Sequence, residues 1–262
     1  MFKDITLGQY YPADSFLHRL DPRIKLLTTL LFLISLFIAD SLPAYTAAVL
    51  YTVVLIYLSR ISLAYMFRGL KGILFLLLFS ILLNLFLTPG REIFSFWFLK
   101  ITEEGLIHAG KMALRLVLLL LGSSLLTFTT TPTGLTDGME QGMSFLKLFK
   151  IPVHEIAMMM SIALRFLPVL TEELDKIERA QMARGADFES GNLLRRVKAL
   201  IPVLVPLIIS AFRRAGELAT AMEARCYHGG EGRTRMKPLK CRGTDYLYLG
   251  INIIYFALII IL

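Results

Sequence analysis

Long apolar runs dominate the first half of the chain and return at its end. The runs cover residues 24–39, 44–59, 69–88, 112–130 and 245–262. A helix needs about 20 apolar residues to cross the roughly 30 Å hydrocarbon layer of a membrane. The third and fourth runs meet this length comfortably, and the polar break at 40–43 is typical of a tight turn between two helices. The pattern therefore predicts about five transmembrane helices.

The pattern changes between residues 131 and 244, where charged residues recur every few positions. This spacing is typical of amphipathic helices. Within the region, Ala199–Phe212 is apolar but covers only about 21 Å as a helix, and Pro202 and Pro206 are expected to bend it. The second apolar stretch, Ile151–Leu170, carries two charged residues, which are costly near a bilayer centre. We expect both stretches to lie at the membrane surface, against another apolar protein, or against the chain's own helices.

Composition and charge agree with a membrane protein. Hydrophobic residues make up 56% of the chain and charged residues 18%, with a formal net charge of +8, whereas soluble domains have about 25% charged residues. In so apolar a chain this excess suits anionic lipid headgroups and cytoplasmic loops, and no nucleic-acid partner is expected. The distribution of basic residues places the N-terminus in the cytoplasm.

These patterns together predict an all-α membrane protein with three parts. Residues 1–130 form transmembrane helices 1 to 4, residues 131–244 form a cytoplasmic or interfacial domain of long amphipathic helices, and residues 245–262 form the final transmembrane helix. We expect a multi-pass protein of the cell membrane.

Residue patterns for catalysis or metal binding are weak. Gly105–Lys111 matches a phosphate-binding loop, but Met112 replaces the hydroxyl residue that would hold magnesium, so we expect a short outer loop entering the fourth span. The four histidines fall in different segments, and Cys226 and Cys241 have no metal-ligand spacing. The sequence therefore predicts no metal site, no cofactor and no catalytic residue.

The predicted spans carry no acidic residue at depth. Asn84 is the notable polar residue of the third span, and we expect it to hydrogen bond to a neighbouring helix. A self-sufficient secondary transporter would need ionisable groups near mid-membrane, and a membrane-embedded enzyme would need a cluster of His, Asp or Glu at the interface. These remain the two alternative functions. If the protein takes part in transport, the energy should come from another chain.

Two charged helical segments end on a similar triplet. The triplets are Ala183-Arg184-Gly185 and Ala224-Arg225-Cys226. A single arginine near a helix C-terminus can simply offset the helix dipole. The same triplet repeated suggests instead two equivalent contacts with two similar sockets, because a guanidinium can bind a carboxylate through two hydrogen bonds. Gly185 is expected to cap the first helix.

The chain resembles the transmembrane T component of energy-coupling factor (ECF) transporters, the EcfT/CbiQ family. The similar stretches are Gly8–Lys25, Pro132–Glu140, Arg165–Gly185 and Arg214–Tyr227. Cys226 departs from the pattern, because the commoner second motif has glycine there. A small residue is retained, so the helix end is expected to keep its geometry, with its cap shifted to Gly229.

The resemblance implies a non-catalytic scaffold that holds two ABC-type ATPases and one small membrane S component. Arg184 and Arg225, with their flanking small residues, would insert into grooves on the two ATPases, which bind the ATP and magnesium. The coupling helices would pass the ATP-driven motion to the S component, for uptake of a vitamin or similar micronutrient that the S component selects. The residues expected at the S component interface are Met158, Met159, Leu204 and Ile208.

Overall fold

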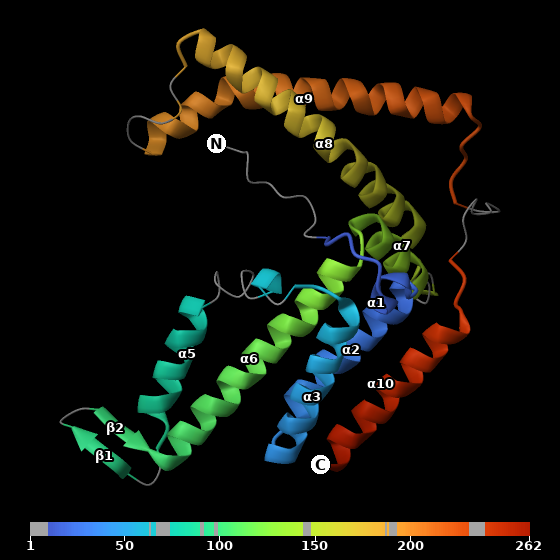
Figure 1. Cartoon of the computed structure of the whole chain (residues 1–262). Helices are drawn as coiled ribbons and strands as arrows, with labels where there is room; N and C mark the ends of the chain where they lie inside the picture. The colour runs from blue at the N-terminus through green and yellow to red at the C-terminus, as the bar shows by residue number, and fades with distance from the viewer. Residues whose placement is uncertain are drawn as a thin grey trace. The chain divides into compact units, whose positions relative to one another are not determined.

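The computed structural model describes residues 10–62, 64–66, 74–89, 92–96, 99–143, 148–186, 188, 193–230 and 239–262. The described chain is almost entirely helical (Figure 1), which confirms the predicted all-α membrane class. In chain order the elements are α1 (Phe16–Arg19), α2 (Pro22–Ile38), α3 (Leu42–Ser59), α5 (Leu74–Leu87), β1 (Glu92–Phe96), β2 (Leu99–Thr102), α6 (Glu103–Thr129), α7 (Pro132–Gly142), α8 (Val153–Ala183), α9 (Leu193–Ala224) and α10 (Gly243–Ile261).

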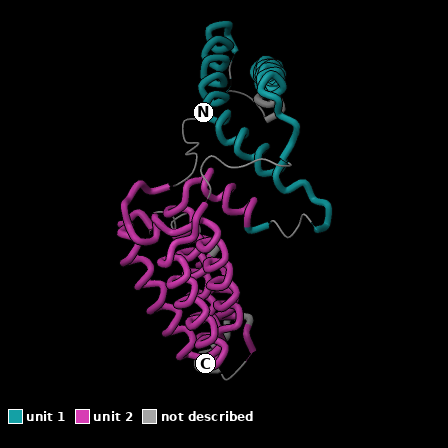
Figure 2. Tube along the Cα trace, turned by 90° about the vertical axis from the view of Figure 1, so that its right-hand side faces the viewer, with its two compact units in different colours: residues 1–6, 142–238 teal, residues 7–141, 239–262 magenta. Residues whose placement is uncertain are grey.

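The chain divides into two compact units, which Figure 2 colours separately. The first consists of residues 1–6 and 142–238 and contains α8 and α9. The second consists of residues 7–141 and 239–262 and contains the helices from α1 to α6 together with α10. The last helix of the chain therefore belongs to the same bundle as the first ones.

Five helices in the described part of the chain are long and apolar enough to cross a membrane: α3, α6, α8, the Lys198–Ala224 part of α9, and α10. The first predicted span forms α2, which has 17 residues, fewer than the usual 20 or so. The third predicted span forms α5 over Leu74–Leu87, and its residues 69–73 lie outside the described residues. The 199–212 segment, which we expected to be too short to cross a membrane, lies inside a longer helix, because α9 continues without a break through the charged residues on both sides. Figure 1 shows α9 changing direction along its length, as prolines inside it predict.

Polar caps and prolines set where the bundle helices begin. Asp21, Ser41 and Thr102 each accept a hydrogen bond from a backbone N–H in the first turn of α2, α3 and α6. Pro22 and Pro43 lie within the first two positions of α2 and α3, where the missing N–H leaves no helical hydrogen bond unmade. The predicted tight turn between the first two apolar runs is confirmed.

The helices α2, α3, α6 and α10 pack together, and a polar seam joins them. The hydroxyl of Tyr51 donates to Oδ1 of Asn252 at 2.7 Å, and the hydroxyls of Ser35 and Tyr255 lie 3.2 Å apart. The rings of Tyr51 and Tyr255 stack with centroids 4.1 Å apart. Apolar packing discriminates poorly between helices in lipid, so these hydrogen bonds help to fix α10 in the bundle.

Asn84 takes no part in this seam. Its Nδ2 donates to the carbonyl of Ser80, one turn earlier in α5, at 2.9 Å. Among the described residues, the expected hydrogen bond to a neighbouring helix is wrong, because the Nδ2 of Asn84 donates within its own helix instead.

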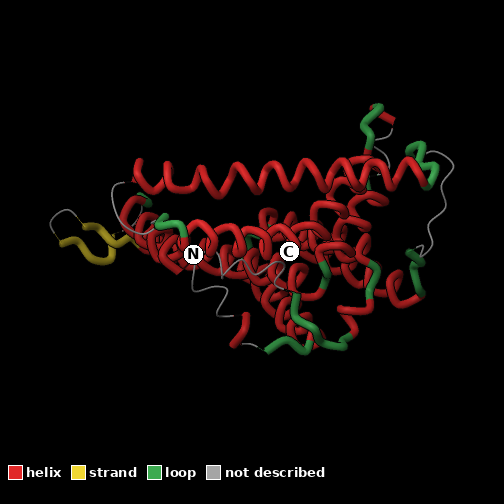
Figure 3. The backbone as a smooth tube through the Cα atoms, turned by 90° about the horizontal axis from the view of Figure 1, so that it is seen from above, coloured by secondary structure: helices red, strands yellow, loops and turns green. Residues whose placement is uncertain are grey.

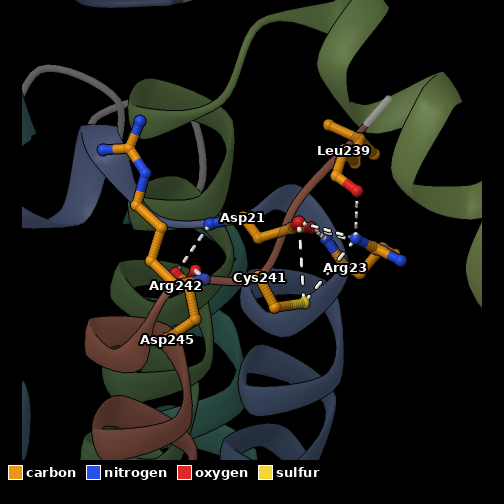
Figure 4. Close-up of polar contacts among 6 residues, drawn as sticks. All are labelled: Asp21, Arg23, Leu239, Cys241, Arg242 and Asp245. Carbon is orange, nitrogen blue, oxygen red and sulfur yellow. Dashed lines mark hydrogen bonds and ion pairs between the residues drawn. The ribbon is translucent and has the colours of Figure 1, made fainter. Parts of the chain in front are cut away.

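A second polar network ties the start of α2 to the start of α10 (Figure 4). Arg23 donates to Oδ2 of Asp21 at 2.9 Å and to the carbonyl of Leu239 at 3.1 Å, and Cys241 Sγ lies 3.8 Å from the same carboxylate. The buried carboxylate of Asp245 accepts the Asp21 N–H at 3.0 Å. Burial alone would raise the pKa of Asp21, but the hydrogen bonds from Arg23 hold it below its ordinary value. The network joins residues about 220 positions apart in the chain.

The antiparallel hairpin of β1 and β2, which Figure 3 shows in yellow, is not predicted by the sequence pattern. It runs directly into α6, whose first residue is Glu103. The expected outer loop at Gly105–Lys111 is therefore wrong, because these residues lie inside the helix. Gly105 is needed there, since a Cβ would meet Thr102 Oγ1 at 2.6 Å and the Leu85 carbonyl at 3.1 Å.

Candidate functional site

The first arginine triplet forms the end of α8. The last helical residue is Ala183, and Gly185 follows Arg184 in the left-handed conformation with φ of +89°. The Gly185 N–H donates to the Met182 carbonyl at 2.9 Å, and the N–H of residue 186 donates to the carbonyl of residue 181 at 3.0 Å. This pair of hydrogen bonds is the Schellman arrangement, which satisfies the last carbonyls of a helix. The predicted cap at Gly185 is confirmed.

The second triplet forms the end of α9 with the same hydrogen bonds. The Cys226 N–H donates to the Glu223 carbonyl at 2.9 Å, and the Tyr227 N–H donates to the Met222 carbonyl at 3.1 Å. Each position corresponds to one 41 residues earlier in α8. Cys226 itself has φ of +55°, so the expected shift of the cap to Gly229 is wrong. The close hydrogen bonds hold a cysteine in a conformation that normally favours glycine.

Both ends present an arginine to the surroundings. Arg184 and Arg225 are exposed, as are Ala183, Ala224 and Cys226. Among the residues that the structure describes, none forms a hydrogen bond or ion pair with either guanidinium. The planar guanidinium at each helix end carries five N–H donors. Their geometry suits a carboxylate or a backbone carbonyl of another chain.

A polar contact between α8 and α9 fixes how the two helices cross. Both oxygens of Glu173 are used: Oε1 accepts from Ser210 at 2.6 Å, and Oε2 accepts from Arg214 Nη2 at 2.7 Å and from its Nε at 3.2 Å. Glu173 lies ten positions before Ala183, and Arg214 lies ten positions before Ala224. The crossing is therefore about 15 Å along the helix from each arginine end, and Figure 1 shows the ends on different arms of the pair.

An apolar stripe follows the exposed face of α9. Its residues recur at intervals of three and four positions, and each is about half exposed or more. They are Ile201, Leu204, Val205, Ile208, Ile209 and Phe212. This spacing places them along one side of the helix. A continuous uncovered stripe of this kind marks a surface for lipid or another protein.

The three consecutive methionines near the beginning of α8 differ in how exposed they are. Met159 and Met160 are exposed, and Met158 is half-buried. Farther along, Phe166 of α8 and Leu218 and Met222 of α9 line a shallow apolar groove of about 280 Å³ between the two helices. The predicted interface residues of both helices therefore lie at least partly open to a partner.

The crossing residues Glu173, Ser210 and Arg214 are not indicated by the sequence pattern. One signal was available: Ser210 and Arg214 are four positions apart, which places them on the same face of a helix. Nothing in the sequence pattern shows that their partner is Glu173, because a carboxylate within a charged helix has many possible neighbours.

Comparison with known proteins gives a consistent result. The family described as "Cobalt transport protein" (CbiQ) matches residues 13–236. A Clostridium kluyveri protein named "Energy-coupling factor transporter transmembrane protein EcfT" is 53% identical over 94% of this chain and 92% of its own length. A protein of the same name from Ruminiclostridium cellulolyticum is 51% identical over 100% of this chain and 98% of its own length. Another from Bacillus subtilis is 50% identical over 94% of this chain and 93% of its own length. With its apolar helices and its two matched helix ends, this multi-pass membrane chain belongs to the EcfT/CbiQ family of ECF transporter transmembrane proteins.

Proposed function

We propose that this chain is the coupling subunit of an ECF-type ABC importer. In this role it does not hydrolyse ATP. Two ABC-type ATPases bind ATP and magnesium, and their motion enters this chain through Arg184 and Arg225. The observation that carries the proposal is that two helices end in the same hydrogen-bonded cap and each presents an exposed arginine. Two equal sockets on a pair of similar ATPases explain why one chain would hold two such ends.

The crossing of α8 and α9 supports a lever-like transmission. A helix transmits force along its axis because its backbone hydrogen bonds run in that direction. The contact of Glu173 with Ser210 and Arg214 lies at equal distances along the chain from the two arginine ends. When the ATPases move together and apart, the two arms would turn about this contact.

The apolar surface of α8 and α9 would bind a small membrane S component. The S component in turn binds the substrate, a vitamin or similar micronutrient. The apolar stripe of α9, which includes Leu204 and Ile208, and the exposed Met159 of α8 supply an uncovered surface for an apolar partner. Met158 would adjust to that partner as the helices move, because the unbranched methionine side chain fits changing surfaces. In this arrangement the N-terminus and the coupling helices face the cytoplasm, in accord with the excess of basic residues.

The test removes each arginine from the complete transporter. We expect Arg184→Ala and Arg225→Ala each to reduce recovery of the ATPases with the membrane subunits and to lower substrate uptake, and the double variant to abolish uptake. Arg179→Ala is the matched control, because Arg179 is an exposed arginine on the helix that ends before Arg184, and its Nε donates to the carbonyl one turn earlier. A double variant that recovers both ATPases and transports at the wild-type rate would refute the proposal.

A further inference from the structure

A groove of about 860 Å³ lies within the second unit, between α1, the end of α3 and the beginning of α10. Its walls are held together by the packing of α1 on α3 and by an edge-to-face contact between the rings of Phe16 and Tyr248, with centroids 6.3 Å apart. The volume falls within the range of about 300–1,000 Å³ that is usual for sites of small ligands and cofactors. None of the residues proposed to take part in coupling lines it.

The lining of the groove is positively charged. Arg19, Arg60 and Arg242 line it together with one acidic residue, Asp14. Both oxygens of Asp14 are taken up by Arg19, at 2.7 Å from Nε and 2.6 Å from Nη2. Arg60 and Arg242 are exposed, and no described residue forms an ion pair with either. Figure 4 shows the guanidinium of Arg242 extending away from the Asp21 network at the start of α10.

The groove lies where a lipid headgroup would be found. Arg60 directly follows α3 and Arg242 directly precedes α10, and both helices are long and apolar enough to cross a membrane. The groove therefore lies at the same end of two candidate spans, at the depth of the headgroups. Tyr57 and Leu58, which also line it, are exposed on the last turn of α3. They offer an apolar wall beside the cations, with an aromatic ring at the interface where such rings are common.

We propose that this groove binds one anionic phospholipid. Arg60 and Arg242 bind the phosphate, since guanidinium groups donate pairs of hydrogen bonds to phosphate oxygens. Tyr57 and Leu58 contact the upper part of the acyl chains. Asp14 does not repel the phosphate strongly, because Arg19 pairs with it. A lipid held in this way would join the end of α3 to the beginning of α10.

The test measures lipid binding by the full chain in detergent after lipid has been removed. Phosphatidylglycerol, phosphatidylcholine or inorganic phosphate is added, and bound molecules are counted by native mass spectrometry. We expect phosphatidylglycerol to bind in preference to phosphatidylcholine, and a large molar excess of inorganic phosphate to leave it in place. Arg60→Gln and Arg242→Gln should each weaken phosphatidylglycerol binding by about fivefold, because one basic residue near an anionic surface contributes roughly that factor.

The matched control is Lys111→Gln. Lys111 binds the carbonyl of Asp40, before the other end of α3, about 27 Å from Arg60 along that helix, so its loss should leave binding unchanged. Arg60→Lys and Arg242→Lys retain the charge and should bind more lipid than the glutamine variants. The lysine variants, which keep the charge, still test the groove if a glutamine variant fails to fold. Equal binding of both lipids, displacement by phosphate, or an equal loss in Lys111→Gln would overturn the proposal.

Discussion

Single residues decide how the two arginines are presented, and Cys226 is the most informative of them. It occupies with φ of +55° the position that Gly185 occupies with +89° in the matching cap. A side chain in this conformation costs about 1 kcal/mol because its Cβ approaches the neighbouring carbonyl. We predict that Cys226→Gly slows hydrogen exchange in the last turn of α9, by an amount equivalent to about 1 kcal/mol in local opening free energy.

Two further variants test whether the Cβ at this cap position causes the effect. Cys226→Ala keeps the Cβ and should leave exchange unchanged, whereas Gly185→Ala adds a Cβ at the equivalent position of α8 and should destabilise that end by a similar amount. Unchanged or faster exchange in Cys226→Gly would show that the cysteine side chain stabilises the cap by some other contact.

Residue identities predicted local conformation better than distant contacts. The cap at Gly185 follows from a glycine placed after a helical run, and the structure confirms it. Lys25 belongs to the basic N-terminal segment by sequence, yet it is buried, and its Nζ donates to the carbonyl of Thr129 at 2.9 Å. That carbonyl lies at the end of α6, 104 positions away. The sequence shows the charge of Lys25, but only the packed bundle shows which helix end it satisfies.

Packing between elements depends on small residues at close approaches, and Gly122 of α6 is the sharpest case. A Cβ there would overlap the ring of Phe32 in α2, which is buried and enclosed by the rings of Tyr51 and Tyr255. We predict that Gly122→Ala destabilises the bundle by about 1–3 kcal/mol, because the ring has little room to move. The measurement is the thermal unfolding midpoint of the full chain in detergent.

Gly110 gives the matched control on the same helix. Beyond its chain neighbours and the backbone of its own helix, no described atom lies within 4 Å of a Cβ added there. Gly110→Ala should therefore be neutral or stabilising by up to about 1 kcal/mol, since alanine favours helix. Adding Phe32→Leu to Gly122→Ala should recover part of the loss. If the two glycine variants unfold at the same temperature, the close approach of α2 and α6 is not limiting.

The ion pair at the crossing of α8 and α9 gives a second prediction about contacts between helices. Glu173 and Arg214 are partly exposed, with 24% and 37% of their side chains accessible, so their ion pair should contribute only about 0.5–1 kcal/mol. We predict a coupling energy of this size in a double-mutant cycle of Glu173→Gln and Arg214→Ala, measured by denaturant unfolding. Transport should fall more than stability does, because the contact sets the angle between the two arms. Additive effects on both readouts would exclude a coupled crossing.

The whole molecule consists of an apolar helix bundle and a pair of long amphipathic helices. The sequence predicted this division better than it predicted where each long helix begins and ends. Apolar runs marked the positions of α3, α6 and α10 because burial in lipid requires them. The pattern did not show that the apolar and charged stretches of α8, and those of α9, continue as one helix each. Helix continuity depends on backbone hydrogen bonds, which persist where the side-chain pattern changes.

The last prediction concerns the surface that these long helices leave uncovered. If the stripe on α9 contacts the S component, Leu204→Asp or Ile208→Asp would place a carboxylate in an apolar interface without a partner. We expect S component recovery to fall by at least about tenfold in either variant, while both ATPases remain bound. Arg213→Asp introduces the same carboxylate at an exposed position of the same helix, about 100° around it from Phe212, and should leave recovery unchanged. Wild-type recovery in the two stripe variants would instead assign this face to lipid, while the arginine ends could still serve the ATPases.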